Sequence, residues 1–196
     1  MVSILACYGT GEGQTAAVAD RIVDVLVDRG HDATAVDVTD ETPDVEAFDA
    51  VLVGASIHAS AHQKSIREFV QSNRDALAAR PTAFFQVSLS SATEEGREKA
   101  AGYVETFVDE TGWHPDRIGQ FGGALRYSEY GFLKRLLMKQ IAKRTIDEMP
   151  EPDSSGDIEF TDWHEVETFA ADVAAFVEGR FGIVPPAVDE REGGTG

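Results

Sequence analysis

The chain has 196 residues and a formal net charge of −18, from 35 acidic and 17 basic side chains. Its length suits one domain with a sizeable core, and its charge argues against nucleic-acid binding. A single cysteine, Cys7, excludes a disulfide within the chain, and no stretch approaches the ~18 apolar residues of a membrane span. The acid excess and the scarcity of lysine predict adaptation to high salt, where self-repulsion is screened. An ordinary acidic protein is the alternative.

A glycine-rich loop that carries hydroxyl groups follows the first predicted strand. The apolar run at residues 2–7 predicts that strand, and residues 15–29 predict the first helix. Glycines let the backbone approach an anion, and the N–H groups of a first helical turn point at it. The loop therefore predicts a phosphate site made of Thr10, Gly11, Glu12, Gly13, Gln14 and Thr15.

Three kinds of loop are compared with this one. A nucleoside-triphosphate loop ends in Gly-Lys-Ser/Thr, whereas this loop ends in Gly13-Gln14-Thr15. A dinucleotide fingerprint has wider glycine spacing than the glycines at 9, 11 and 13. The remaining pattern resembles the phosphate loop of flavodoxins, which holds the single phosphate of FMN. A glycine-rich turn without a ligand is the other alternative.

The rest of the chain alternates strands and helices. Further strands are expected at 33–38, 49–56, 82–88 and 118–125, and further helices at 63–77, 94–110 and 162–180, the last with Thr161 as N-cap. Five strands with interleaved helices predict an α/β fold with a doubly wound, five-stranded parallel sheet. In the flavodoxin-like order 2-1-3-4-5, a ligand lies at the carboxyl ends of strands one, three and four. The loops there are 8–15, 56–62 and 88–95.

An insertion at about 126–160 separates the fifth strand from the closing helix. Within it, residues 131–145 predict an amphipathic helix, and residues 131–146 hold five basic side chains and no acidic one. Such a helix suits an anionic membrane surface or an acidic ligand. A packed helix whose cations favour its carboxyl end is the alternative. We expect one FMN-binding domain over 1–181 and a disordered tail over 182–196.

Several motifs taken together resemble one family. Gly13-Gln14-Thr15, Gly54-Ala55-Ser56-Ile57, Gly123-Ala124-Leu125-Arg126-Tyr127, the basic helix and Thr161-Asp162-Trp163 are similar to those of the flavodoxin-type, quinone-dependent protoporphyrinogen IX dehydrogenases. The resemblance runs from the first strand to about residue 181. It implies FMN, a tetrapyrrole substrate, a membrane quinone as acceptor, and a cytoplasmic protein attached peripherally to the membrane. An oligomer is compatible with the sequence.

The expected chemistry belongs to the flavin, so no catalytic acid–base group and no metal site are predicted. Arg126 and the helix lysines are expected to meet substrate propionates. His58 is also a candidate substrate contact, and His58 and His62 are candidates for proton transfer or are exposed spectators. The negative charge of Glu12 is unfavourable beside a phosphate. The second and third loops lack Trp and Tyr, so we expect an open flavin face. The flavin is expected to contact the phosphate loop and Ser56, Ile57, His58, Ser88, Leu89, Ser90 and Ser91.

Three other functions stay open at this point. One is a flavodoxin that only carries electrons, and another is an NAD(P)H:quinone reductase, although no nucleotide site beyond the flavin loop is evident. The third is a membrane-recruited interaction module that has kept the fold without the flavin.

Overall fold

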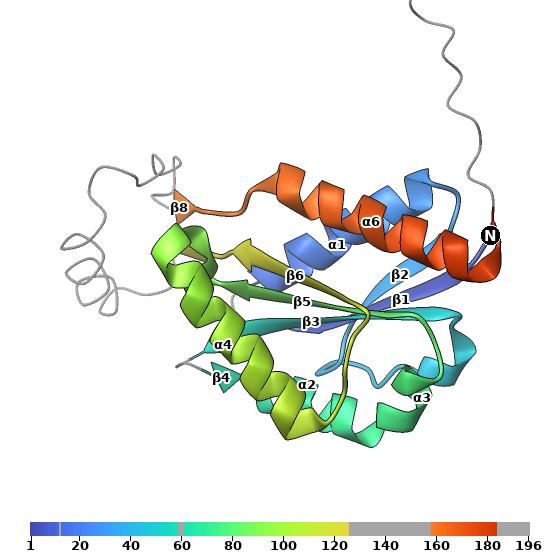
Figure 1. Cartoon of the computed structure of the whole chain (residues 1–196), viewed down its shortest axis with the longest axis horizontal. Helices are drawn as coiled ribbons and strands as arrows, with labels where there is room; N and C mark the ends of the chain where they lie inside the picture. Colours follow the sequence, from blue (N-terminus) through green and yellow to red (C-terminus); the bar gives the residue numbers. More distant parts are fainter. Residues whose placement is uncertain (12, 59–60, 126–157, 184–196) are drawn as a thin grey trace, which may run out of the picture.

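Five parallel strands form the centre of the molecule (Figure 1). The computed structural model describes residues 1–11, 13–58, 61–125 and 158–183. The strand order is β2-β1-β3-β5-β6, which confirms the predicted doubly wound sheet. The strands are β1 (Ser3–Gly9), β2 (Asp32–Asp37), β3 (Ala50–His58), β5 (Thr82–Ser88) and β6 (Arg117–Gly122). A short strand, β4 (Ala61–His62), pairs antiparallel with the end of β3.

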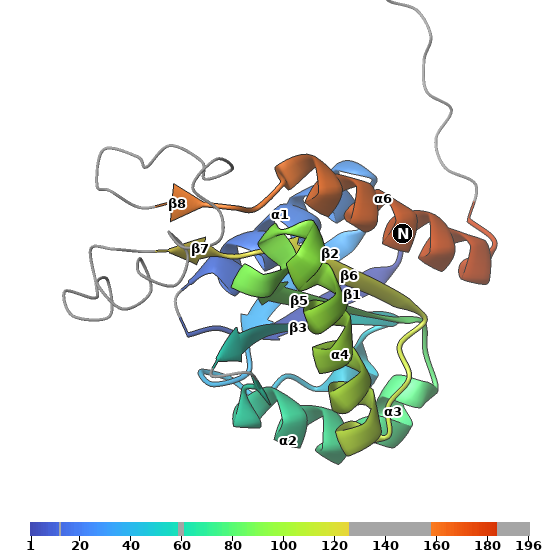
Figure 2. The ribbon, with the colours of Figure 1, turned by 60° about the vertical axis from the view of Figure 1, so that its left-hand side comes forward.

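Helices cover both faces of the sheet (Figures 1 and 2). Of the helices in the described residues, two lie on one face and three on the other, so two apolar clusters form, one on each side of the sheet. Because both faces are covered, all seven residues of β5 are buried. In the described part of the chain, no helix is long and apolar enough to cross a membrane. On one face lie α1 (Gln14–Asp28) and α6 (Trp163–Phe181), and on the other α2 (Lys64–Ser72), α3 (Arg74–Ala78) and α4 (Glu94–Thr111).

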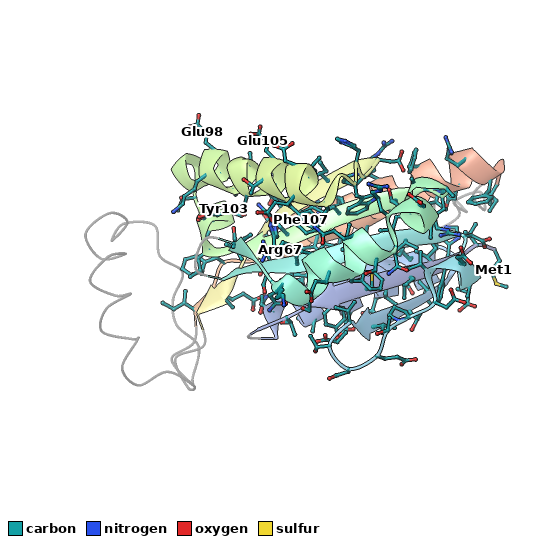
Figure 3. All side chains as sticks on the ribbon, turned by 90° about the horizontal axis from the view of Figure 1, so that it is seen from below. Met1, Arg67, Glu98, Tyr103, Glu105 and Phe107 are labelled. Carbon is teal, nitrogen blue, oxygen red and sulfur yellow. The ribbon has the colours of Figure 1, made fainter. Side chains whose placement is uncertain are left out.

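Helix α4 has an apolar inner face and a charged outer face (Figure 3). Phe107 is fully buried in the core cluster, whereas Glu98 and Glu105 point away from the sheet into solvent. Arg67 of α2 pairs with Glu110 of α4 at 2.8 Å and joins the two helices. This division of polar and apolar side chains is the one that the sequence predicts for a surface helix.

The segment predicted as one helix over 63–77 forms two helices, and Asn73 lies at the break. Its backbone leaves the helical region, with φ −110° and ψ 13°. Its side-chain amide donates to the carbonyl of Phe69 at 2.9 Å. Asparagine competes with the backbone in this way, which makes it a poor interior residue of a helix. The prediction of a single helix is therefore wrong, although Ile66 and Val70 are buried as expected.

The fifth strand ends at Gly122, earlier than the predicted end at residue 125. The N–H of Gly123 still donates to the carbonyl of Ser88, the last residue of β5, at 3.1 Å. Its own carbonyl accepts from the N–H of Phe160 at 3.0 Å. These bonds tie the end of β6 to the loop after β5 and to the segment that leads into α6.

A separate two-stranded ribbon joins the two ends of the predicted insertion. β7 (Ala124–Leu125) pairs antiparallel with β8 (Ile158–Glu159). Residues 126–157, with the predicted basic helix at 131–145, lie outside the described residues, as do residues 184–196 of the tail. The ribbon agrees with an insertion between the fifth strand and the last helix.

Asp162, and not Thr161, caps α6. Its Oδ1 accepts from the N–H groups of His164 at 2.9 Å and Glu165 at 3.3 Å. The hydroxyl of Thr161 instead donates to the carbonyl of Gly122 at 2.7 Å. The predicted cap is therefore wrong by one residue, because the end of β6 engages Thr161.

Candidate functional site

A pocket opens at the carboxyl ends of the parallel strands, toward the left in Figure 1. The loops after β1, β3 and β5 meet there with the chain beyond β6, where a doubly wound sheet binds its ligands. Its volume of about 100 Å³ is small for a whole drug-sized ligand and suits one end of such a molecule. The lining residues are Thr10, Gly11, Gln14, Thr15, Ser56, Ile57, Val87, Ser88, Leu89, Gly123 and Ala124.

The loop between β1 and α1 leaves the start of the helix without a side-chain cap. Gly13 has φ +81°, in the left-handed region that glycine adopts without strain. Its N–H donates to Oγ1 of Thr10 at 2.9 Å. In the described chain no side chain caps α1, and its first turn holds no acidic residue. Because the first N–H groups of a helix have no acceptor within it, this end favours an anion.

Two buried hydroxyl groups of the lining residues have no partner. Oγ1 of Thr15, in the first turn of α1, and Oγ of Ser56, near the end of β3, are inaccessible and without a hydrogen bond among the described residues. A buried polar group without a partner costs about 1–3 kcal/mol. Phosphate oxygens would accept from both hydroxyls, so these residues fit a phosphate group.

His62 lies in the core and not in the pocket. Its Nε2 donates to Oε1 of Gln86 at 3.1 Å, and its ring packs against Phe84 and Phe107. Burial lowers the pKa of His62 to about 4, and the hydrogen bond to Gln86 only partly opposes the effect. His62 is therefore a neutral core residue, and the expectation of an exposed side chain or a proton carrier is wrong.

Two serines are hydrogen-bonded to each other in the third loop, which follows β5. The Ser88 hydroxyl accepts from the N–H of Ser91 at 3.1 Å, and the two hydroxyl groups lie 2.8 Å apart. Ser88 and Leu89 line the pocket, whereas Ser90 and Ser91 do not. Leu89 is 37% exposed, so it presents an apolar surface to a ligand in the pocket.

Sequence reasoning missed three lining residues, Val87, Gly123 and Ala124. Gly123 and Ala124 belong to a motif that the sequence analysis noted, but the expected strand end at residue 125 placed them within the sheet. The Gly122-Gly123 pair is the signal for an earlier end, since consecutive glycines weaken a strand. The described lining holds no aromatic ring, and the open flavin face stays a prediction.

The remaining predicted residues have different outcomes. Gln14 lines the pocket, but its amide donates to Thr161 and Glu159. Glu12 and Arg126 lie outside the described residues, and His58 ends β3. Among the residues that the structure describes, no cluster of side chains could hold a metal ion. Cys7 is buried, which raises the pKa of its thiol, and its Sγ contacts the carbonyl of Leu52 at 3.3 Å.

Comparison with known proteins agrees with this geometry. A family model described as a flavodoxin domain matches residues 5–150. Over 172 residues the chain is 32% identical to the protoporphyrinogen IX dehydrogenase (quinone) of Escherichia coli (strain K12), covering 87% of this chain and 93% of that protein. The chain belongs to the flavodoxin-type protoporphyrinogen IX dehydrogenase family.

Two further comparisons extend the family assignment. The chain is 34% identical over 174 residues to the protoporphyrinogen IX dehydrogenase (quinone) of Leishmania major, covering 87% of this chain and 74% of that one. A Fusobacterium nucleatum flavodoxin bound to flavin mononucleotide superposes with a TM-score of 0.50 at 11% identity, covering 92% and 99% of the two chains. That likeness shows the fold alone. As a member of this family, the chain is an oxidoreductase with a flavodoxin domain.

Proposed function

We propose that this chain oxidises protoporphyrinogen IX to protoporphyrin IX with FMN and passes the electrons to a membrane quinone. The observation that carries the proposal is its 32% and 34% identity, over most of its length, to dehydrogenases that bear this activity in their names. Hydrogens leave the porphyrinogen in pairs, and each pair that is removed reduces one quinone to its quinol. FMN, when bound, supplies the acceptor for those hydrogens.

The protein's own part is to bind and orient. The start of α1 would face the phosphate, and the hydroxyl groups of Thr15 and Ser56, which have no hydrogen-bond partner among the described residues, would donate to it. The Thr10 hydroxyl fixes the loop by accepting from the N–H of Gly13. Each of these groups is positioned before a ligand arrives, so little ordering is needed on binding.

The aliphatic side of the pocket suits a flat macrocycle. Ile57, Leu89 and Ala124 line it, and Leu89 carries apolar surface exposed to solvent. Such side chains would exclude water beside the part of a ring that enters the pocket. The described lining has no aromatic ring that would cover a flavin as in many electron carriers, so the dehydrogenase is favoured over a carrier.

An anaerobic reconstitution tests the proposal. The purified chain is loaded with FMN in molar salt, protoporphyrinogen IX is added, and flavin absorbance and porphyrin fluorescence are followed together. We expect flavin bleaching matched by porphyrin formation and reversed by a quinone. A bound flavin that does not respond to porphyrinogen would reject the dehydrogenase and support the electron carrier. Bleaching by NAD(P)H alone would support the reductase.

We also propose that the basic segment at 131–145 binds an anionic membrane surface and brings the site to its quinone. In a chain with net charge −18, five basic residues without an acidic one at 131–146 support this role. Flotation with anionic liposomes tests it, comparing the wild type with Leu136→Glu and with Lys134, Lys139 and Lys143 changed to Glu. Equal flotation of all variants would reject the membrane role.

A further inference from the structure

The side-chain amide of Gln14 is hydrogen-bonded to the segment that leads into α6. Nε2 of Gln14 donates to Oγ1 of Thr161 at 2.8 Å and to Oε1 of Glu159 at 3.1 Å. An amide nitrogen has two N–H donors, so these two bonds use both of them. Gln14 is 6% exposed and lies in the first turn of α1, beside the predicted phosphate position. Its side chain therefore connects that turn to residues about 145 positions further along the chain.

The connection continues into the sheet. The hydroxyl of Thr161 accepts from Gln14 and donates to the carbonyl of Gly122, at the end of β6, at 2.7 Å. A side chain at Gly122 would not fit, because its Cβ would lie 2.2 Å from the carbonyl oxygen of Phe160. The end of β6 and the segment before α6 thus pack backbone against backbone.

The same end of β6 is tied to the third loop of the pocket. The N–H of Gly123 donates to the carbonyl of Ser88 at 3.1 Å, and its carbonyl accepts from the N–H of Phe160 at 3.0 Å. A continuous set of hydrogen bonds therefore runs from Ser88 on one side of the pocket to Gln14 on the other. Thr161 lies within this set but does not line the pocket.

We propose that Gln14 and Thr161 form a positioning pair for the FMN phosphate, holding the first turn of α1 in register with the end of β6. The inference rests on the proposed binding of FMN at this pocket. Thr161 acts through Gln14 and not by touching the ligand. Because the pair is bonded to the base of the β7–β8 ribbon, binding of the phosphate also stabilises that ribbon, and a stable ribbon favours phosphate binding.

The test compares FMN with riboflavin, which lacks the phosphate. Thr161→Val keeps the shape of the side chain and removes its hydroxyl, Thr161→Ser restores a hydroxyl, and Gln14→Met keeps the length without the donors. Thr111→Val is the matched control, because the Thr111 hydroxyl also donates to a carbonyl, that of Phe107, at 2.7 Å and away from the pocket. Each full-length variant is titrated with both ligands, and its thermal unfolding is recorded.

We expect Thr161→Val to weaken FMN binding about tenfold, the effect of one well-placed hydrogen bond, with a much smaller change for riboflavin. Thr161→Ser should recover most of the loss, and Thr111→Val should bind FMN like the wild type. The double variant, Gln14→Met with Thr161→Val, should bind FMN no more weakly than whichever single variant has the lower affinity, since both changes break the same connection.

Three results would overturn the positioning pair. They are unchanged FMN affinity in Thr161→Val, an equal loss for FMN and riboflavin, and full additivity of the two single variants. Failure of the wild type to bind FMN would instead reject the proposed cofactor site, so the two failures are distinguishable.

Discussion

Oε1 of Glu178 in α6 lies 3.1 Å from Nε2 of His31, which follows α1, and both side chains are almost fully buried. Arg29 donates to the same carboxylate at 2.9 and 3.2 Å. Burial alone raises the pKa of Glu178, but the hydrogen bonds from Arg29 and His31 outweigh it and hold the pKa below its usual value. One carboxylate thus joins the ends of the two helices that cover one face of the sheet.

Glu178→Gln should lower the free energy of unfolding by about 1–3 kcal/mol. The change removes the charge that compensates the half-buried Arg29 and weakens the hydrogen bond to the buried His31, and breaking one side of a buried pair is costly. Denaturant unfolding at fixed salt measures the loss. Glu167→Gln is the control, because the Glu167–Arg21 pair is exposed and should contribute little to stability. Equal losses in both variants would contradict the prediction.

Stability should fall as the pH is lowered from about 6.5 to about 4, in part because of His62. The pKa of His62 is lowered by burial to about 4 in the folded protein, and its unfolded value is about 6.5. In that window the unfolded chain binds the extra proton, so protonation favours unfolding, by up to about 3 kcal/mol at low pH. Among the charged groups near the ring, Arg67 lowers this pKa and Glu110 raises it.

His62→Gln removes this titration and should flatten the stability profile between those pH values. Carboxylates also titrate at low pH, so the informative quantity is the difference between variant and wild type in urea unfolding. His114→Gln is the control, because His114 is exposed. A profile for His62→Gln that parallels the wild type would show that His62 is not the group responsible.

Thr15→Val should change stability and binding in opposite directions. The Thr15 hydroxyl is buried without a partner, so its removal should stabilise the protein without ligand by about 0.5–1 kcal/mol. The same change should weaken FMN about tenfold, because it removes a donor to the phosphate. Thermal unfolding and FMN titration measure the two effects, and Thr34→Val, at an exposed position of β2, is the control. Unchanged FMN affinity would exclude the hydroxyl as a donor.

Glu159→Gln should tighten FMN binding at low ionic strength. The Glu159 carboxylate accepts from Gln14 at 3.1 Å, and its charge repels a phosphate held by the same helical turn. Glutamine keeps an acceptor and removes the charge. The gain should be a few-fold in dilute buffer and should vanish in molar salt, where exposed charges are screened within ~3 Å. A gain that does not depend on salt would indicate a change of shape instead.

Much of the fold follows from local patterns, whereas the contacts that shape the site do not. Apolar runs and helical spacing locate the strands and helices, and glycines with hydroxyl residues locate the loop around Gly13. The partner of Gln14 lies about 145 residues away, and no local pattern indicates which acceptor a glutamine will meet. Similarly, the hydroxyl of Thr161 donates to the distant carbonyl of Gly122, and Asp162 therefore caps the helix instead of Thr161.

The burial of individual side chains is the second property that local sequence patterns do not predict. His62 precedes Gln63 and Lys64 and so resembles a surface residue, yet β4 places it in the core beside Gln86. At Asn73 the signal is present in the sequence, because asparagine tends to end helices. The apolar spacing around it nevertheless favoured the prediction of a single helix.

The antiparallel pairing of Ala124 with Glu159 and of Leu125 with Ile158 makes the insertion a modular addition to the fold. A chain that leaves and re-enters at adjacent positions can be lengthened, shortened or exchanged without moving the strands beneath it. Joining Leu125 to Ile158 by a two-residue Asn-Gly turn would give a minimal flavin-binding scaffold. The segment at 126–157 could then be studied, or transplanted, as a separate unit.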